Sequence, residues 1–340
     1  MTKAKYKVVT LRKFSSGSTT AEGKELAGLN ADVELVHAVC TTEDELIAAA
    51  RDADAILGGG PLFTHRVLAA LPKCRAIVTY SVGFDSIDVA AATDNGIIIA
   101  NNAASGWCIE EVSNQAMALL LACARKLVRL NDMTKHGRWQ EVRQVLPPMG
   151  SIYGQTLGLV GCGDIGRMTA RKAQCFGMRV SGYDPYVDKA LAREYNISLV
   201  SLPELLKNSD FISVHAPLTR ETWHLMGEEE FKQMKPTAYF INTARGPVVD
   251  EAALIKALQE KRLAGAGLDV FEKEPIEPDN PLLKMDNVVA LPHTGSYSDA
   301  ASERQPVSAA QEVARVLSGR WPRHVVNKTV KPKVELVKGD

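Results

Sequence analysis

Residues 156–168, T-L-G-L-V-G-C-G-D-I-G-R-M, decide the fold class of this 340-residue chain. An apolar strand is expected over Leu157–Val160, and it leads into the glycine pattern G-x-G-x-x-G. A helix is expected over Arg167–Phe176, and a second strand over Val180–Tyr183 follows it. Strand, glycine turn, helix and strand in this order form one βαβ unit of a parallel sheet.

The glycine pattern also predicts a ligand. Gly161 permits the tight turn, Gly163 lets a pyrophosphate approach the backbone, and Gly166 lets the helix pack close to the strand. The free N–H groups of the first helical turn would meet the diphosphate. Asp184 follows Gly163 by 21 residues (184 − 163), where a carboxylate would bind the ribose hydroxyls and repel a 2′-phosphate. The sequence therefore predicts NAD in preference to NADP; the alternative is a plain glycine turn with an exposed Asp184.

The alternation of short apolar strands and Ala/Leu-rich helices continues in both directions. Further strands are expected at Tyr6–Leu11, Val33–Val39, Ala55–Leu57, Ala76–Thr79, Ile97–Ala100, Phe211–Val214, Tyr239–Asn242, Gly265–Leu268 and Val288–Leu291. Helices are expected over Thr42–Ala50, capped by Thr41 or Thr42, and over Ile109–Leu130 and Ala300–Leu317, with a connector over Gly137–Tyr153. Two such series predict two α/β domains with a ligand cleft between them, outside the carboxyl ends of the strands.

Composition excludes several classes of protein. The 40 Lys and Arg residues balance 40 Asp and Glu residues, so the basic excess of a nucleic-acid-binding protein is missing. The longest apolar run, Ala116–Ala124, is far shorter than the ~20 residues of a membrane span. The six cysteines form no C-x-x-C pair, and no metal site is predicted. With no apolar signal core near the N-terminus, we expect a cytoplasmic protein without nucleic-acid or membrane partners.

Motifs spread along the chain resemble those of the D-isomer-specific 2-hydroxyacid dehydrogenases. In chain order they are Ser81–Asp88 (S-V-G-F-D-S-I-D), Gly182–Tyr186 (G-Y-D-P-Y), His215–Thr219 (H-A-P-L-T), Asn242–Gly246 (N-T-A-R-G), Leu268–Pro275 (L-D-V-F-E-K-E-P) and Leu291–Gly295 (L-P-H-T-G). Such a series is far more specific than any one of its members. The resemblance is to the branch that includes the phosphoglycerate dehydrogenases and the C-terminal-binding-protein corepressors.

The resemblance implies a catalytic set of Arg245, Glu274 and His293, and the chemistry of a 2-oxo acid requires these residue types. A guanidinium binds a carboxylate and the adjacent carbonyl as a fork. A histidine exchanges protons near neutral pH, and a carboxylate on its other ring nitrogen favours the protonated form. Taken singly, the three could be a turn cap, a solvated charge and a satisfied histidine; taken together, they favour catalysis. Formate dehydrogenases of the same superfamily carry glutamine where a glutamate here pairs with the histidine. Glu274 therefore argues against formate oxidation.

The resemblance also implies binding residues. Arg245 and His293 would contact the substrate, together with the backbone amides of Val82 and Gly83, which form an anion site in a glycine turn. The residues expected at the cofactor are Gly161, Gly163, Asp164, Ile165, Gly166, Asp184, His215, Ala216, Pro217, Thr222, Thr243, Ala244, Asp269 and Gly295. The implied activity is NAD-dependent interconversion of a 2-oxo acid and a D-2-hydroxy acid. Phosphoglycerate and hydroxypyruvate or glyoxylate remain alternative substrates, and an NAD(H)-sensing scaffold of the corepressor type remains an alternative function.

Three stretches depart from the family pattern. Gly58–Leu62 lacks the arginine that holds phosphate in the phosphoglycerate branch, so a non-phosphorylated or weakly anionic substrate is expected. Ala104–Cys108 and Ser113-Asn114 replace a Pro-Gly turn and an Ala-Glu pair, which leaves the pocket shape open; Trp107 is either a pocket wall or a core residue. The lysine-rich segment from Asn327 to Asp340 is expected to be a mobile, solvated tail.

Residues 1–101 with 297–327 are expected to form a flavodoxin-like substrate domain, residues 102–296 a doubly wound, NAD-binding Rossmann domain, and residues 328–340 the tail. Both domains would then be Rossmann-like α/β domains. The resemblance further implies a homodimer built on the NAD-binding domains.

Overall fold

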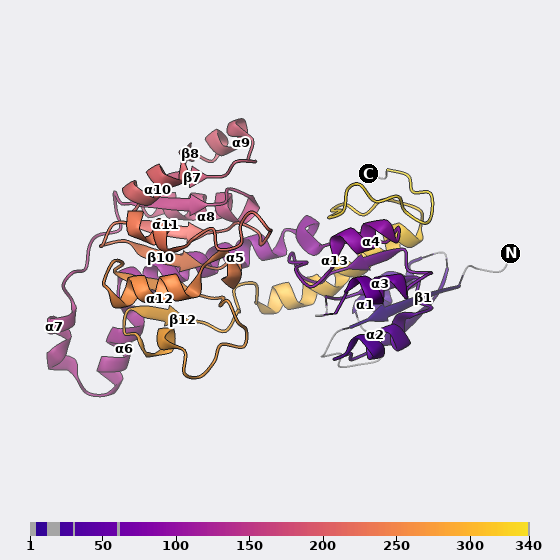
Figure 1. The fold of residues 1–340 in the computed structure, drawn as a ribbon, viewed down its shortest axis with the longest axis horizontal. Coiled ribbons are helices and arrows are strands. Elements are labelled where there is room, and N and C mark those ends of the chain that lie inside the picture. The colour runs from indigo at the N-terminus through magenta and orange to yellow at the C-terminus, as the bar shows by residue number, and fades with distance from the viewer. Residues whose placement is uncertain (1–4, 12–20, 30, 60–61, 339–340) are drawn as a thin grey trace. The chain divides into compact units, whose positions relative to one another are not determined.

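The computed structural model describes residues 5–11, 21–29, 31–59 and 62–338. The chain divides into two compact units, which are described separately (Figure 1). Unit 1 comprises Met1–Cys108 and Ser298–Asp340, and unit 2 comprises Ile109–Tyr297. Each unit holds one parallel sheet covered by helices, which confirms the predicted class of two Rossmann-like α/β domains.

The sheet of unit 1 has five parallel strands in the order β2-β1-β3-β4-β5. They are β1 (Lys5–Thr10), β2 (Asp32–His37), β3 (Ala55–Leu57), β4 (Ala76–Val78) and β5 (Ile98–Ala100). This is the flavodoxin-like order. Every residue of β3, β4 and β5 is buried, as expected for a parallel sheet covered on both faces.

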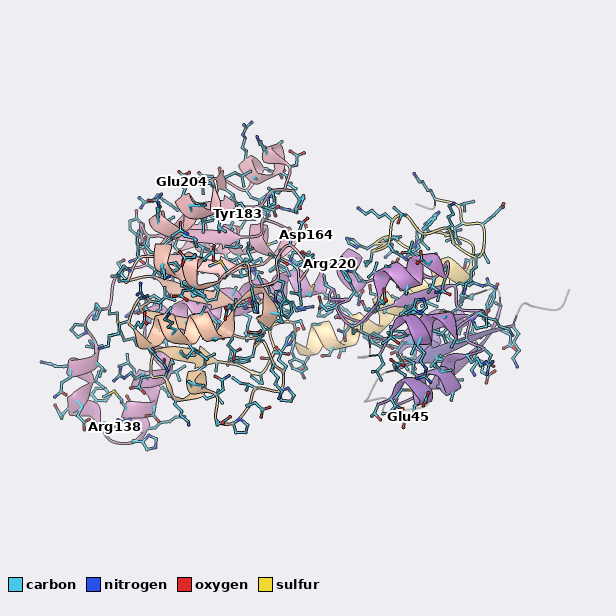
Figure 2. The ribbon with its side chains drawn as sticks, viewed as in Figure 1. Glu45, Arg138, Asp164, Tyr183, Glu204 and Arg220 are labelled. Carbon is cyan, nitrogen blue, oxygen red and sulfur yellow. The ribbon has the colours of Figure 1, made fainter. Side chains whose placement is uncertain are left out.

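Two apolar clusters fill the two sides of the unit 1 sheet. One includes residues of α2 (Glu43–Ala50), α3 (His65–Ala69) and α4 (Val89–Asp94), and the other includes residues of α1 (Ala21–Ala27) and α13 (Asp299–Leu317). Thr42 caps α2 in a capping box with Glu45, which Figure 2 labels, so the predicted cap is confirmed.

The sheet of unit 2 has seven parallel strands in the order β12-β11-β10-β9-β6-β7-β8. They are β6 (Thr156–Val160), β7 (Arg179–Tyr183), β8 (Ser198–Leu199), β9 (Phe211–Val214), β10 (Tyr239–Asn242), β11 (Gly265–Leu268) and β12 (Val288–Ala290). Counted within the unit, this is the Rossmann order with one additional strand. The two-residue strand β8 is missing from the sequence prediction because two residues carry no periodicity.

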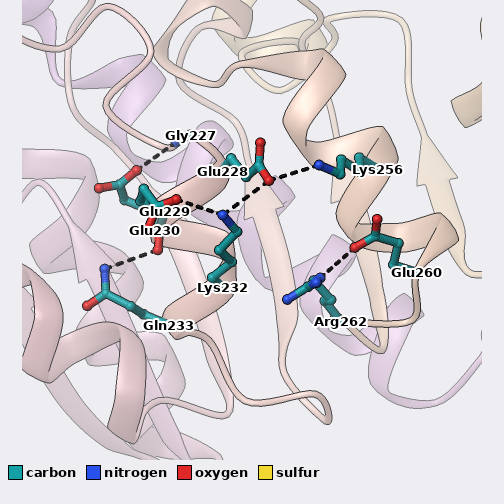
Figure 3. Close-up of polar contacts among 9 residues, drawn as sticks. All are labelled: Gly227, Glu228, Glu229, Glu230, Lys232, Gln233, Lys256, Glu260 and Arg262. Carbon is teal, nitrogen blue, oxygen red and sulfur yellow. Dashed lines mark hydrogen bonds and ion pairs between the residues drawn. The ribbon is translucent and has the colours of Figure 1, made fainter.

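Helices of unit 2 also contribute to two apolar clusters. One cluster includes residues of α5 (Trp107–Ala124), α8 (Asp164–Cys175) and α9 (Lys189–Glu194), and the other includes residues of α10 (Leu202–Asn208), α11 (Glu228–Gln233) and α12 (Glu251–Gln259). On the outer surface, one carboxylate oxygen of Glu228 pairs with Lys232 at 3.1 Å and with Lys256 of α12 at 2.8 Å (Figure 3). Because such exposed pairs contribute little to stability, the apolar clusters hold these helices in place.

The single helix predicted over Ile109–Leu130 is wrong. The chain breaks at Lys126, where φ is 50°, and continues as α6 (Leu127–Lys135). The ammonium group of Lys126 donates to the carbonyls of Val145 and Leu146, at 2.7 and 3.2 Å. This contact with the connector, which itself contains η2 (Trp139–Glu141) and α7 (Val142–Val145), links residues 19 and 20 positions apart. The helical pattern of the sequence could not reveal it.

The prediction of a mobile tail after Asn327 is also wrong. Val330 is buried against Val316 of α13 and Ile98 of β5, and Trp321 forms a backbone hydrogen bond with Val337. The ammonium group of Lys333 donates to the carbonyls of Leu71 and Pro72 at 3.0 Å each, and partial burial lowers its pKa. The tail therefore packs onto unit 1. The lysines suggested solvation, but the apolar residues between them decide the packing.

Within the described ranges, no helix is both long enough and apolar enough to cross a bilayer.

Candidate active site

The candidate residues of unit 2 meet at one edge of its sheet. Because all the strands are parallel, their carboxyl ends lie at the same edge. The strands that lead into candidate residues are β6 before Gly161, β7 before Asp184, β9 before His215, β10 before Arg245, β11 before Glu274 and β12 before His293. The connections diverge at β6, which lies between β7 and β9, so the ligand crevice is expected in front of β6.

The three glycines of the loop after β6 differ in the space around them. Gly161 has φ of 98°, and a β-carbon there would lie 2.7 Å from the backbone nitrogen of Ala216. A β-carbon on Gly166 would lie 2.3 Å from the carbonyl oxygen of Gly161, so helix and loop are in direct contact. At Gly163, no atom lies within 4 Å of the place that a β-carbon would occupy, which leaves space for a ligand against the backbone.

Helix α8 begins at Asp164, three residues earlier than predicted, and has no side-chain cap (Figure 2 labels Asp164). Its N-cap residue is Gly163, so the N–H groups of the first turn are left for a ligand. Nearby, the carboxylate of Asp184 accepts hydrogen bonds from the backbone of Cys162 at 2.8 Å and of Tyr186 at 2.8 Å. Asp184 therefore joins the glycine loop to the loop after β7.

The loop after β9 packs on the glycine loop through the backbone of His215 and Ala216. Burial lowers the pKa of His215 to about 4, so its ring is neutral at pH 7, and its Nε2 lies 3.0 Å from the hydroxyl of Ser213. Thr222 stabilises the rest of this loop, because its hydroxyl donates to the carbonyl of Pro217 at 2.6 Å. These side chains thus bind within β9 and the loop that follows it.

His293 and Glu274 form a hydrogen-bonded pair. Nδ1 of His293 lies 2.7 Å from one carboxylate oxygen of Glu274, and the other oxygen accepts from the N–H of Phe271 at 3.0 Å. Since a carboxylate only accepts, the proton of the ring lies on Nδ1. Nε2 of His293 makes no hydrogen bond within the residues that the structure describes. The pair thus leaves one imidazole nitrogen available to a ligand.

The pair shifts the pKa of both partners. The hydrogen bond to Glu274 raises the pKa of His293, against burial, which lowers it. Burial alone would raise the pKa of Glu274, but the hydrogen bonds from His293 and from the backbone of Phe271 leave it lowered. The charge of Arg245 lowers the pKa of both groups, which brings the three predicted catalytic residues into one electrostatic neighbourhood.

The turn that carries Arg245 is held by Asn242 and Gly246. The side-chain amide of Asn242 donates to the carbonyl of Arg245 at 3.0 Å, and its oxygen accepts from the N–H of Ala244 at 3.0 Å. A β-carbon on Gly246 would lie 1.8 Å from the carbonyl oxygen of Phe271, so this turn presses against the loop that leads to Glu274. Asn242 had no predicted role, although an asparagine two residues before a turn amide is a sequence signal for such a bond.

Asp269 fastens the loop that carries His293. Its carboxylate accepts from the N–H groups of Thr294 at 3.0 Å and Gly295 at 2.7 Å, and from the side chain of Gln115 at 3.3 Å. Its backbone carbonyl accepts from the N–H of His293 at 2.8 Å. Asp269 is 1% exposed, so it acts as a buried anchor. The role of Gln115 could not be read from sequence, because it lies 154 residues away.

Lys172 of α8 anchors Ser113 and Asn114 of α5, two of the residues that depart from the family pattern. Its ammonium group contacts the hydroxyl of Ser113 at 2.6 Å, the side-chain oxygen of Asn114 at 2.7 Å and the carboxylate of Glu110 at 2.9 Å. The Ser113-Asn114 pair therefore holds α8, the helix that follows the glycine loop. Trp107 is buried, as the core interpretation expects, and its indole N–H finds no acceptor among the described residues.

Val82 and Gly83 lie in unit 1, in the loop after β4. Within the described part of the chain, neither backbone N–H donates to a protein acceptor, so both are available to an anion. The segment Gly58–Leu62 follows β3; Gly60 and Pro61 lie outside the described residues, and Gly58 has φ of 123°.

The edge of unit 2 fits a dinucleotide cofactor. The open position at Gly163 and the uncapped first turn of α8 suit a diphosphate. Thr243 is 7% exposed, and its hydroxyl has no hydrogen-bond partner within the described ranges. A buried polar atom without a partner is costly, and a bound ligand would satisfy it.

Comparison with known proteins gives consistent matches. Residues 117–295 match the NAD binding domain, and residues 15–107 the catalytic domain, of D-isomer specific 2-hydroxyacid dehydrogenases. Glyoxylate reductase of Korarchaeum cryptofilum is 42% identical over 290 residues, covering 84% of this chain and 86% of that protein. D-3-phosphoglycerate dehydrogenase of Methanocaldococcus jannaschii is 39% identical over 309 residues, covering 90% of this chain and 57% of that protein.

Structural comparison agrees. D-lactate dehydrogenase from Aquifex aeolicus, complexed with NAD and lactic acid, matches with a TM-score of 0.80 at 30% identity, covering 94% of this chain and 99% of that one. The matched family regions together span most of the sequence, and they include the glycine loop and the loops of Arg245, Glu274 and His293. The chain therefore belongs to the D-isomer specific 2-hydroxyacid dehydrogenase family.

Proposed function

We propose that this NAD-dependent oxidoreductase reduces a small, non-phosphorylated 2-oxo acid to the D-2-hydroxy acid and catalyses the reverse oxidation. The observation that carries the proposal is the 2.7 Å contact between Nδ1 of His293 and Glu274, with the charge of Arg245 beside it. This arrangement supplies an acid of raised pKa next to a cation, as the reduction of a carbonyl next to a carboxylate requires.

In this mechanism, NADH when bound supplies the hydride that adds to the carbonyl carbon. Arg245 binds the substrate as a fork and polarises the carbonyl. His293 donates its Nε2 proton to the carbonyl oxygen, which receives the electron pair of the broken π bond, so the product is the alcohol and the imidazole becomes neutral. Glu274 stabilises the protonated ring and fixes its orientation. In the oxidation direction, neutral His293 takes the alcohol proton.

The substrate class follows from unit 1 and the relatives. The N–H groups of Val82 and Gly83 suit a carboxylate, and the segment Gly58–Leu62 offers no cationic side chain for a phosphate. Glyoxylate reductases are among the similar proteins, which supports a small substrate such as glyoxylate or hydroxypyruvate. The relatives named here are enzymes, so they favour catalysis over the scaffold function of the corepressors.

The cofactor residues are assigned by the same reasoning. The first turn of α8 would bind the diphosphate, and Asp184 would accept from the ribose hydroxyls and repel a 2′-phosphate. The loops of His215–Pro217 and Thr243-Ala244 line the same edge of the sheet, which supports their place in the site.

The assembly and location are part of the proposal. Leu127 and Val128 of α6 and Trp139 are exposed large apolar side chains of unit 2, and a second copy of the chain would cover them. A monomer mass by light scattering over a wide concentration range would contradict the dimer.

The six cysteines are all free, in keeping with a reducing cytoplasm. Recovery outside the cytoplasmic fraction would contradict that location.

Replacing His293 by alanine tests the function. We expect kcat for the preferred 2-oxo acid to fall at least ~10²-fold, because a general acid is lost. The assay follows NADH oxidation with glyoxylate, hydroxypyruvate, pyruvate, phenylpyruvate and 3-phosphohydroxypyruvate, and a parallel series with NADPH tests Asp184. The control is His65→Ala, which removes an exposed histidine of unit 1. Unchanged turnover by His293→Ala would reject the assignment, and no turnover by the unmodified protein with tight NADH binding would favour the scaffold.

A further inference from the structure

The loop Tyr80–Gly83 of unit 1, here called the amide loop, has all four of its carbonyl groups hydrogen-bonded within the unit. The carbonyl of Ser81 accepts from the hydroxyl of Thr79 at 2.7 Å and from the N–H of Asn102 at 3.2 Å. The carbonyl of Val82 accepts from the side chain of Asn101 at 2.8 Å. The carbonyl of Tyr80 accepts from the side chain of Asn102 at 3.1 Å, and that of Gly83 from the hydroxyl of Ser81 at 2.9 Å.

The geometry of the peptide unit fixes the directions of the N–H groups in the amide loop. In a planar trans peptide unit, the carbonyl of one residue and the N–H of the next point in opposite directions. Because the Ser81 carbonyl points inward to Thr79, the N–H of Val82 points outward. Because the Val82 carbonyl points inward to Asn101, the N–H of Gly83 points outward as well. Neither N–H has an acceptor in the described part of the chain.

The donors that turn the loop are buried and fixed. Thr79 is 0%, Asn101 3% and Asn102 1% exposed. The side chain of Asn102 also donates to the carbonyl of Gln305 at 3.0 Å and accepts from the hydroxyl of Ser308 at 2.5 Å, so it ties the amide loop to α13. A side-chain amide with several hydrogen-bond partners is held in one orientation, and the loop carbonyl groups that it binds are therefore held in place as well.

We propose that Thr79, Asn101 and Asn102 are positioning residues, which hold two N–H groups of the amide loop outward as a preformed site for the substrate carboxylate. This inference rests on the proposed function and extends it to residues that do not touch the substrate. A preorganised pair of N–H groups binds an anion without the cost of ordering the loop at each encounter.

Three variants test the proposal directly. Thr79→Val keeps the shape of the side chain and removes the donor to Ser81, whereas Thr79→Ser keeps the hydroxyl. Asn101→Ala removes the donor to Val82. We expect Thr79→Val and Asn101→Ala to raise KM for the 2-oxo acid about tenfold or more, the scale of a weakened hydrogen bond to a charged group. We expect kcat at saturation to change far less, and Thr79→Ser to restore KM.

The control is Asn327→Ala in the same unit. Asn327 is 4% exposed, and its side chain makes three hydrogen bonds, with the N–H of Ile99, the carbonyl of Ile97 and the hydroxyl of Thr93, but none with the amide loop. This variant should lower the melting temperature at least as much as Asn101→Ala while leaving KM unchanged. NADH affinity, measured by fluorescence titration, should be unaffected in all four variants, because the predicted cofactor residues lie in unit 2.

Inhibition by oxamate separates anion binding from chemistry, because oxamate carries the carboxylate but accepts no hydride. Its inhibition constant should rise in parallel with KM in Thr79→Val and Asn101→Ala. KM and inhibition constants within twofold of wild type in both variants would overturn the proposal. If the unmodified protein reduces no 2-oxo acid and binds no oxamate, the proposed function itself has failed. If the unmodified protein reduces a 2-oxo acid and the variants bind oxamate as tightly as it does, only the positioning role is rejected.

Discussion

At the scale of single residues, the backbone of His293 has an uncommon conformation. Its φ of 53° lies in the left-handed region, which a non-glycine residue enters at a cost of about 1 to 3 kcal/mol at functional sites. Asp269 holds this conformation, because its carbonyl binds the N–H of His293 and its carboxylate binds the next two N–H groups. The imidazole is thus aimed by a buried neighbour before any ligand arrives.

The raised pKa of His293 gives a pH prediction. Reduction requires the protonated ring, so activity should persist below this pKa and decline as pH rises through it. Glu274→Gln removes the main influence that raises the pKa, while burial and Arg245 still lower it. We expect the alkaline limb of the kcat/KM profile for 2-oxo acid reduction to move to lower pH. An alkaline limb that does not move would show that Glu274 does not control the protonation of His293.

At the scale of elements, the glycine loop and α8 act as one piece. The contact of Gly166 with Gly161 sets how closely the helix approaches the loop, whereas Gly163 faces open space. Lys172, near the other end of α8, fixes the helix to Glu110 and Ser113 of α5. The helix is therefore anchored at both ends, and its first N–H groups are presented in a constant position.

Two alanine substitutions distinguish ligand space from packing. Gly163→Ala should leave the melting temperature near that of the wild type, because its φ of −66° suits alanine and nothing lies within 4 Å of the new β-carbon. It should nevertheless weaken NADH binding, measured by fluorescence titration, because the methyl group fills the ligand space. Gly166→Ala should cost about 1 to 3 kcal/mol of stability, because its β-carbon would lie 2.3 Å from a carbonyl oxygen. Equal effects of the two changes on stability would contradict this distinction.

At the scale of the whole molecule, each unit has its own sheet and its own apolar clusters. The C-terminal segment belongs to unit 1, because Val330 completes a cluster with Ile98 and Val316. Lys333 fixes the same segment to the carbonyls of Leu71 and Pro72, 262 and 261 residues away in the chain.

Two valines of this segment provide a matched test. Val330 is 6% exposed and Val337 is 65% exposed. Val330→Ala should lower the free energy of unfolding by about 1 to 2 kcal/mol, from the loss of two buried methyl groups. Val337→Ala should change it by less than about 0.5 kcal/mol, as surface substitutions usually do. Denaturant unfolding measures both, and a neutral Val330→Ala would show that the segment does not pack on unit 1 in solution.

Much of the fold was readable from local patterns. The strands Ala55–Leu57, Phe211–Val214, Tyr239–Asn242 and Gly265–Leu268 have the predicted bounds, because short apolar runs between turn residues are set by near neighbours in the chain. The cap of Thr42 and the glycine loop also depend on spacings of a few residues. The prediction of one helix over Ile109–Leu130 failed at Lys126, which has φ of 50° and binds carbonyls 19 and 20 residues away, contacts that no local helical pattern encodes.

The sequence by itself determined the βαβ alternation, the glycine loop with Asp184, and the residue types of the proposed catalytic set, because each depends on short-range sterics or on motifs of adjacent residues. Only the tertiary structure decided how these groups are held. Asp269 with Gln115 and Asn101 with the amide loop are contacts that folding creates, between residues 154 and 19 positions apart in the chain. A buried polar group takes whichever partner the packing of the strands brings within reach.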